Sequence, residues 1–213
     1  MTALVLSVGG KTYSSWPLRA WLALAWSGLP FEERPIQLDA PGYGLGAIAE
    51  VVAVSPSARV PALSIDAVTI WDSLAIAEWV AEAAPEAGLW PDDPMERALA
   101  RSLTAGMHAG LAGLRRERPC NLRRRTSFPP HLPEDARADL ARIDAIFASQ
   151  PERAEGRGPY LFGRRGVVDA FCLPVATRLR TFDAPCVGAA AAYRDTLLAD
   201  EAYQHWERDA AAT

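Results

Sequence analysis

The sequence has few cysteines and no long apolar run, and each shortage excludes a class of protein. Cys120, Cys172 and Cys186 are odd in number and widely spaced, so they suit neither a disulfide framework nor a metal site, and we expect packing residues and no metal. No stretch approaches the ~18 apolar residues of a membrane span. The apolar start is only about seven residues long and no cleavage signature follows it. We therefore expect a cytoplasmic protein without a membrane partner.

The chain also lacks the positive charge of a nucleic-acid binder. Its 22 basic and 26 acidic residues leave a net charge of −4, and Lys11 is its only lysine. A negative balance argues against general binding to nucleic acid. Hydrophobic residues make up 50% of the 213 positions, which is enough to build a sizeable core in one large domain or two small ones.

The first part of the chain has the pattern of an α/β domain. A buried strand, a loop, an amphipathic helix closed by Gly28, and a second strand give a βαβ unit whose crossover implies parallel pairing. A loop with a short helix near residues 47–52 follows, then a hairpin and another helix. This βαβ-α-ββα order predicts a thioredoxin-like domain. The expected strands of the βαβ unit are residues 3–8 and 31–38, and the domain is residues 1–82.

The second part is predicted to be all-helical. Pro85, Gly88, Pro91 and Pro94 mark a linker at residues 83–94. Helical spacing continues almost throughout residues 95–213. Helices are expected at about 94–116, 134–149 and 167–180, with two short ones at the end. The predicted architecture is therefore an α/β domain followed by an all-α domain.

The most informative segment is residues 58–73, ARVPALSIDAVTIWDS. Pro61 cannot donate a ladder hydrogen bond, so it belongs at the start or edge of a strand. A second short strand ends at Asp72 and Ser73, both good N-caps for the amphipathic run that follows. A helix N-terminus with a hydroxyl is a ready carboxylate site, and an extended Val60 offers its backbone to a peptide-like ligand.

This segment, "RVPAL" followed by "DSLAIAEWV", resembles the glutathione-binding half of a cytosolic glutathione transferase. The resemblance implies that the Val60–Pro61 bond is cis and that Val60 pairs with the cysteinyl backbone of glutathione. It also implies that Asp72 and Ser73 bind the γ-glutamyl group; Arg59 belongs to the same expected set. The resemblance covers the whole chain, the second half by pattern more than by motif. It further implies a homodimer, with glutathione as co-substrate.

The loop before the first helix, in "TYSSWPLRAWLAL", resembles the activation loop of classes that use serine or cysteine. A hydroxyl and a helix N-terminus can stabilise the glutathione thiolate, whose free pKa is ~8.5. Ser14 and Ser15 are the candidates. Ser15 is favoured as the N-cap because Pro17 suits a first turn; the alternative is that both serines only cap the helix. Tyr13 and Thr12 are next in line, and the lack of cysteine here disfavours a reductase mechanism.

The pocket for an electrophile is expected between this loop and the first long helix of the second part. Trp16, His108, Leu111 and Arg115 have a suitable register, although a lone histidine such as His108 is more often a packed or solvated residue. Residues 123–125 are three arginines that form either a solvated cluster or an attraction for an acidic substrate.

A further motif, "YLFGRRGVVDAFCLPVATRL", resembles the buried helix signature of the same family, in which a serine or threonine cap precedes an aspartate. Asp169 matches the aspartate. Gly166 stands in place of the capping hydroxyl, which costs only a few tenths of a kcal/mol. We therefore assign Asp169 a structural role rather than a catalytic one.

The leading functional hypothesis is a glutathione transferase that conjugates glutathione to small hydrophobic electrophiles. One alternative is a glutathione-dependent isomerase, similar to maleylacetoacetate isomerase, because the serine loop also resembles the zeta-class loop, although its Ser-Ser-Cys order is absent. Another is a non-catalytic binding or interaction module with the same fold. The intact set of Val60, Pro61, Asp72 and Ser73 argues against the module.

Overall fold

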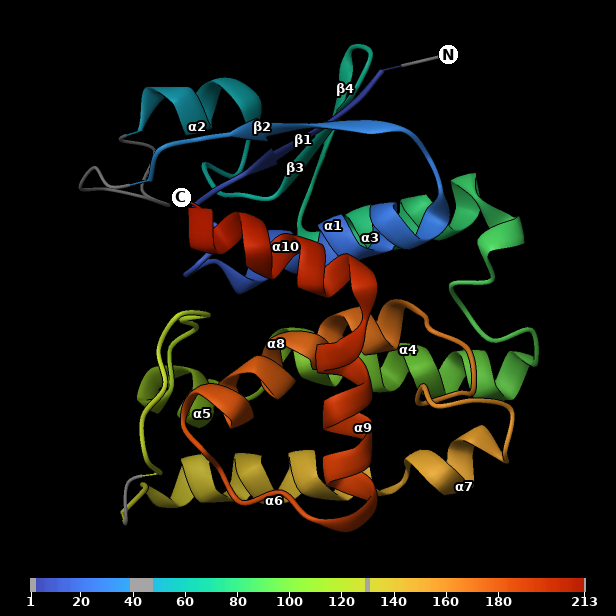
Figure 1. The fold of residues 1–213 in the computed structure, drawn as a ribbon. Helices are drawn as coiled ribbons and strands as arrows, with labels where there is room; N and C mark the ends of the chain where they lie inside the picture. Colours follow the sequence, from blue (N-terminus) through green and yellow to red (C-terminus); the bar gives the residue numbers. More distant parts are fainter. Residues whose placement is uncertain (1–2, 39–47, 129–130, 213) are drawn as a thin grey trace.

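The computed structural model describes residues 3–38, 48–128 and 131–212 (Figure 1). A thioredoxin-like part comes first and a helical part follows. The elements of the first part are β1 (Leu4–Val8), α1 (Ser15–Ser27), β2 (Phe31–Pro35), α2 (Ala49–Val54), β3 (Ala62–Ile65), β4 (Val68–Trp71) and α3 (Ser73–Ala83).

The strands form one mixed sheet in the order β2-β1-β3-β4. The α1 crossover makes β1 and β2 parallel, as expected of a βαβ unit, whereas β3 pairs antiparallel with both β1 and β4. The edge strand β2 is largely exposed and carries Glu32, Glu33 and Arg34, charges that discourage further strand pairing. The sequence predicted the parallel pair and the hairpin of this thioredoxin-like sheet; the strand order comes from the structure.

Helices α1 and α3 lie on one face of the sheet, and α2 lies on the other (Figure 1). Because α1 is enclosed by the sheet on one side and by the helical part on the other, it is buried nearly all round, including Leu18 and Leu22. It ends at Gly28, whose left-handed φ of 74° suits a residue without a Cβ.

The helical part packs beneath α1 and α3 (Figure 1). None of the helices within the described ranges has the length and apolarity to cross a bilayer. After the 3-10 turn η1 (Pro85–Ala87), the elements are α4 (Pro94–Ala109), α5 (Ala112–Glu117), α6 (Glu134–Ala148), α7 (Gln150–Ala154), α8 (Val167–Thr181), α9 (Gly188–Ala199) and α10 (Glu201–Ala212).

Helix α8 is the centre of the helical part. All of its residues except Arg180 are buried, and it packs against α1, α4 and α9. One hydrophobic core runs from Leu6 and Leu22 in the first part to Phe171 in α8. Because the core is continuous, the division into residues 1–82, 83–94 and 95–213 stays a prediction.

The prediction of one long helix at 94–116 is wrong, because α4 ends at Ala109 and a separate helix, α5, begins at Ala112. Leu111 adopts a left-handed φ of 62°, which ends the helical hydrogen bonding. The Arg115 side chain then satisfies orphaned carbonyls: its Nε donates to Gly110 O at 2.9 Å and its Nη2 to Met107 O at 2.5 Å.

The N-cap assignment at α1 is also corrected. Ser14 is the N-cap and Ser15 is the first helical residue, and the Ser14 side chain makes no capping bond. The cause is that Ser14 keeps extended angles, with φ −99° and ψ 107°, while Ser15 already has helical geometry. The correction moves Ser15 under the helix start, where it is buried.

Asp169 has the structural role predicted for it. Its carboxylate accepts hydrogen bonds from Gly166 N at 2.8 Å and Leu161 N at 3.1 Å, and from the hydroxyl of Tyr193. A Cβ at Gly166 would lie 2.6 Å from Leu89 O, which explains why no hydroxyl residue caps this helix.

We expect Asp169→Ala to lower the free energy of unfolding by about 3 kcal/mol, because it leaves three buried donors unpaired. Urea denaturation followed by circular dichroism measures this, with Asp195→Ala, an exposed residue of α9, as the control. A loss no larger than that of the control would contradict the role.

The wild type should also carry a pH signature, because burial raises the pKa of Asp169 to about 6. An unfolded aspartate titrates near 3.9, so the folded state binds this proton more tightly. The contribution of Asp169 to stability therefore falls as the pH rises from about 4 to about 6. Asp169→Asn should remove that decline.

Candidate active site

Two cavities meet at the side chain of Trp16, which lines both of them. The smaller has a volume of about 300 Å³ and lies between the start of β3, the N-terminus of α3 and helix α4. The larger, of about 1030 Å³, lies between the loop after β1 and the helical part. The smaller is lined by Trp16, Ser57, Arg59, Val60, Pro61, Trp71, Asp72, Ser73 and His108.

The smaller cavity brings together the residues that the sequence assigned to the backbone and the γ-glutamyl end of glutathione. The Val60–Pro61 bond is cis, as predicted. Val60 and Pro61 are buried and Arg59 is exposed at the rim. Asp72 and Ser73 begin α3 opposite them, so the cavity offers backbone from one wall and a helix N-terminus from the other.

Asp72 is held in an unusual backbone conformation at the N-cap of α3. Its φ of 76° and ψ of 132° are uncommon outside glycine and cost of order 1–3 kcal/mol. One carboxylate oxygen, Oδ1, accepts from Leu74 N at 2.8 Å. The other, Oδ2, lies 3.3 Å from Nε2 of His108. The conformation directs a carboxylate toward the cavity at the positive end of a helix.

Ser73 is the second polar group of this wall. The residue is only 1% exposed, and its Oγ has no hydrogen-bond partner among the described residues. Leaving a buried hydroxyl unpaired costs roughly 1–3 kcal/mol. A ligand oxygen bound at the α3 N-terminus would supply the missing partner.

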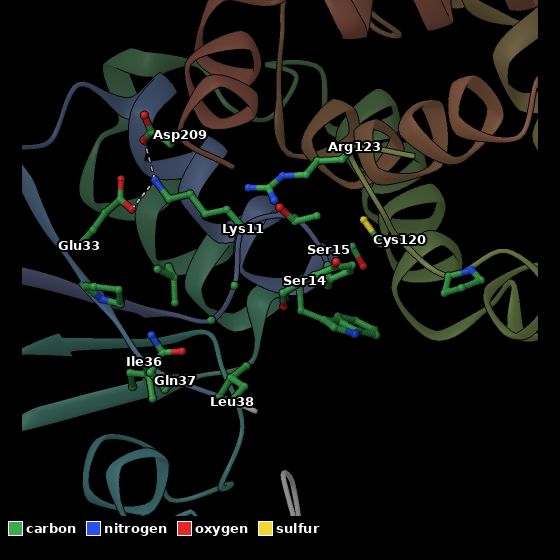
Figure 2. A pocket seen from close by; sticks show the side chains of 18 of the residues that line it. Lys11, Ser14, Ser15, Glu33, Ile36, Gln37, Leu38, Cys120, Arg123 and Asp209 are labelled. Carbon is green, nitrogen blue, oxygen red and sulfur yellow. Dashed lines mark hydrogen bonds and ion pairs between the residues drawn. The ribbon is translucent and has the colours of Figure 1, made fainter. Parts of the chain in front are cut away.

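The larger cavity holds the two predicted serines on one wall (Figure 2). Ser15 Oγ accepts a long bond of 3.4 Å from Arg178 Nη2, and neither serine hydroxyl donates to another group in the described ranges. The alternatives fit less well, because Thr12 donates to Ala210 O and Tyr13 is 67% exposed. A thiol entering here would meet a hydroxyl beside a cation at the start of α1.

Arginines dominate the electrostatics around Trp16. Arg19 and Arg115 lie over its ring, at 4.3 and 4.9 Å from the centroid. Arg19 is fully buried and its guanidinium has no hydrogen-bond partner in the described part of the chain. Burial, with the nearby Arg115 and Arg178, holds the pKa of Arg19 well below its ordinary value. Burial likewise lowers the pKa of Arg115 to about 10. The site therefore has an excess of positive charge next to the serines.

Two of the expected electrophile-pocket residues lie elsewhere. His108 faces the smaller cavity through its contact with Asp72. Leu111 is buried in the core and lines neither cavity. Arg115 and Trp16 do line the larger cavity. Leu111 lies at the break after α4, where it turns into the core, whereas His108 lies within α4 and meets the start of α3 through Asp72.

Sequence reasoning missed part of the larger cavity, namely Arg178, Lys11 and Asp209. Lys11 pairs with Glu33 at 2.7 Å and with Asp209 of α10 at 2.8 Å (Figure 2). These contacts bring the C-terminal helix against the loop, a long-range effect with no local pattern. Arg178 did carry a signal, since it is one of three charged residues in a mostly apolar helix and it is buried.

Residues 13–83 match the family described as glutathione S-transferase, N-terminal domain. Maleylacetoacetate isomerase of Rattus norvegicus is 39% identical over 104 residues, which are 49% of this chain and 47% of that protein. The match thus spans about half of the relative's length. Maleylacetoacetate isomerase of Pseudomonas aeruginosa is 29% identical over 77% of this chain and 76% of its own.

A solved structure of a glutathione transferase homolog from Burkholderia, with bound glutathione, shares the fold. It has a TM-score of 0.72 and 22% identity, and the superposition covers 99% of each chain. The resemblance read from the sequence is confirmed at the level of fold and N-terminal domain.

Proposed function

We propose that this chain, whose residues 13–83 match the glutathione S-transferase N-terminal domain family, is an enzyme that binds glutathione in the smaller cavity and presents its sulfur to a small electrophile in the larger one. The observation that carries the proposal is that the smaller cavity is lined by both the Asp72 carboxylate and the buried Ser73 hydroxyl, which has no hydrogen-bond partner among the described residues. The bound glutathione of the Burkholderia homolog supports it.

The smaller cavity suits the γ-glutamyl end of glutathione, which carries an ammonium and a carboxylate. Asp72 Oδ2 accepts from the ammonium. Ser73 Oγ and the N-terminal amides of α3 take the carboxylate, aided by the helix dipole. Val60, at the start of β3, aligns the cysteinyl part, and the thiol then passes Trp16 toward Ser14 and Ser15.

The serines and the arginines act on the sulfur. A hydroxyl that donates to the sulfur favours the thiolate over the thiol, and the charge of Arg178 beside Ser15 does the same. The thiolate then attacks the electrophile. In conjugation, a sulfur–carbon bond forms and either a leaving group departs or a proton is taken up. In isomerisation, sulfur adds to a conjugated double bond, rotation follows, and the thiolate is expelled.

Isomerisation of an unsaturated acid is the chemistry that the relatives favour, since both named above are maleylacetoacetate isomerases. Arg115, Arg123 and Arg178 on the wall of the larger cavity would attract a carboxylate substrate. Conjugation remains the second candidate because Val8, Ile36 and Leu38 on the opposite wall would accept an apolar electrophile. The homodimer and the cytoplasmic location stay predictions.

Ser73→Ala should weaken glutathione binding by ~1–3 kcal/mol, because the ligand carboxylate loses a buried donor. Isothermal titration calorimetry at neutral pH measures the dissociation constant. Ser102→Ala, whose exposed hydroxyl bonds only to Ala98 O within α4, serves as the control. An unchanged constant in Ser73→Ala would count against this binding mode.

Removing the true thiolate donor should raise the pKa of the bound thiol and cut turnover by ~10- to 1000-fold. The measurement is thiolate absorbance against pH in Ser14→Ala and Ser15→Ala with glutathione bound. We expect the larger effect in Ser15→Ala, because Ser15 lies next to Arg178. If neither titration moves, Tyr13→Phe is the next variant and the serine assignment is wrong.

The stoichiometry of glutathione separates the two chemistries. An isomerase should convert many equivalents of a cis-configured unsaturated keto acid per glutathione, because the thiolate is released in each cycle. A conjugating enzyme consumes one glutathione per product. Substrate absorbance and free thiol, followed together, decide between them; thiol loss equal to product formed would contradict isomerisation.

A further inference from the structure

His108 connects the helical part of the protein to the wall of the smaller cavity that Asp72 and Ser73 form. It projects from α4, and its Nε2 lies 3.3 Å from Oδ2 of Asp72 at the start of α3. The ring is fixed by the edge of Trp16, at 5.2 Å between centroids, and by Phe171, at 5.9 Å. The imidazole is therefore a built part of the cavity wall and contacts Asp72, which is the one carboxylate among the described residues that line this cavity.

The two oxygens of Asp72 have different tasks. Oδ1 caps α3 through Leu74 N, so it is committed to the fold. Oδ2 is the oxygen that remains for a ligand ammonium, and it is also the oxygen that His108 contacts. A bound amino group must therefore share this atom with the imidazole.

The cost of sharing depends on the protonation of His108. A neutral imidazole carries its proton on one nitrogen and a lone pair on the other, and the tautomer with the proton on Nε2 directs its N–H toward Asp72 Oδ2, 3.3 Å away. Nδ1 is buried and has no hydrogen-bond partner in the described part of the chain, so a proton there would be an unpaired buried donor. Asp72 attracts the charged ring, whereas Arg19 from α1 and Arg115 from α5 repel it; burial is the largest effect, and it lowers the pKa of His108.

We propose that His108 is a proton-dependent positioning residue for the amino end of glutathione: the neutral ring orients Asp72 for the ligand ammonium, and the protonated ring competes with that ammonium for Oδ2. The inference rests on the proposed function. Its consequence is a loss of glutathione affinity in acid that originates in the helical part rather than in the thioredoxin-like domain.

Thermodynamic linkage gives the direction in which glutathione affinity changes with pH. A ligand ammonium beside the ring disfavours the imidazolium, so binding lowers the pKa of His108 further and releases a proton. Affinity is then full above the pKa of the free protein, which lies below 6.5, and falls as the pH drops through it. A further shift of one unit corresponds to about a tenfold loss.

The test is calorimetric titration with S-methylglutathione from about pH 7.5 to about pH 5. This analogue has no titrating thiol, and its carboxylates stay ionised in this range. Its amine is mostly protonated at about pH 7.5 and becomes fully protonated in acid, a change that would strengthen binding and so cannot produce the expected loss. The wild type should bind more weakly at the acid end, by up to about tenfold if binding lowers the pKa of His108 by one unit. A constant affinity, or one that rises in acid, would overturn the proposal.

Two variants of His108 separate positioning from packing. His108→Gln keeps a donor for Asp72 but does not titrate, so its affinity should be independent of pH. His108→Phe keeps the ring without a donor, so it should bind more weakly than His108→Gln at about pH 7.5. If His108→Gln keeps the wild-type slope, the proposal is wrong.

His205→Gln is the matched control, since His205 also faces a carboxylate, Asp209 at 3.7 Å, but outside the smaller cavity. It should keep the wild-type slope, and a flat profile there would overturn the assignment to His108. If the wild type binds S-methylglutathione and Ser73→Ala weakens that binding, but the affinity does not change with pH, only the role of His108 fails. If wild type does not bind at all, the proposed function fails with it.

Discussion

The site depends on how one carboxylate is shared. Asp72 accepts from Leu74 N with one oxygen and contacts His108 with the other, and it does so from a backbone conformation that few residues adopt. The first contact fixes the start of α3 and thereby the amides and the Ser73 hydroxyl. The second ties the helical part to the same point. If Asp72 changed position, the smaller cavity would lose its charge, its helix cap and its contact with α4 together.

The second constraint is the position of Trp16 between the two cavities. Arg19 and Arg115 lie over its ring and His108 meets it edge-on. Buried cations without acidic partners are unfavourable. The two arginines therefore lower the folding stability of the protein and also make the electrostatic potential around Trp16 positive. An anionic sulfur or carboxylate that reaches Ser14 and Ser15 offsets that cost. The arrangement thus favours a thiolate over a thiol beside Ser14 and Ser15.

The elements that the sequence could predict are those with local signals. Three such signals are the proline before β3, the Asp72–Ser73 cap and the helical period of α1, and each is contained in a few neighbouring residues. The fold and the lining of the smaller cavity could be predicted from them. The break at Leu111 could not be predicted, because Arg115 stabilises it through a side-chain contact with the preceding turn. The contact of His108 with Asp72 joins two residues that lie far apart in the sequence, so no local pattern indicated which cavity His108 faces. The pairing of Lys11 with Asp209 joins residues at opposite ends of the chain and has no local signature.

The central claim is that the smaller cavity binds the amino-acid end of glutathione through Asp72 and Ser73. The most direct measurement is a crystal structure of the protein with S-methylglutathione. We expect the ligand ammonium within about 3.2 Å of Asp72 Oδ2 and a ligand carboxylate oxygen within the same distance of Ser73 Oγ. Electron density for the ligand only in the larger cavity, with Ser73 Oγ still unpaired, would contradict it.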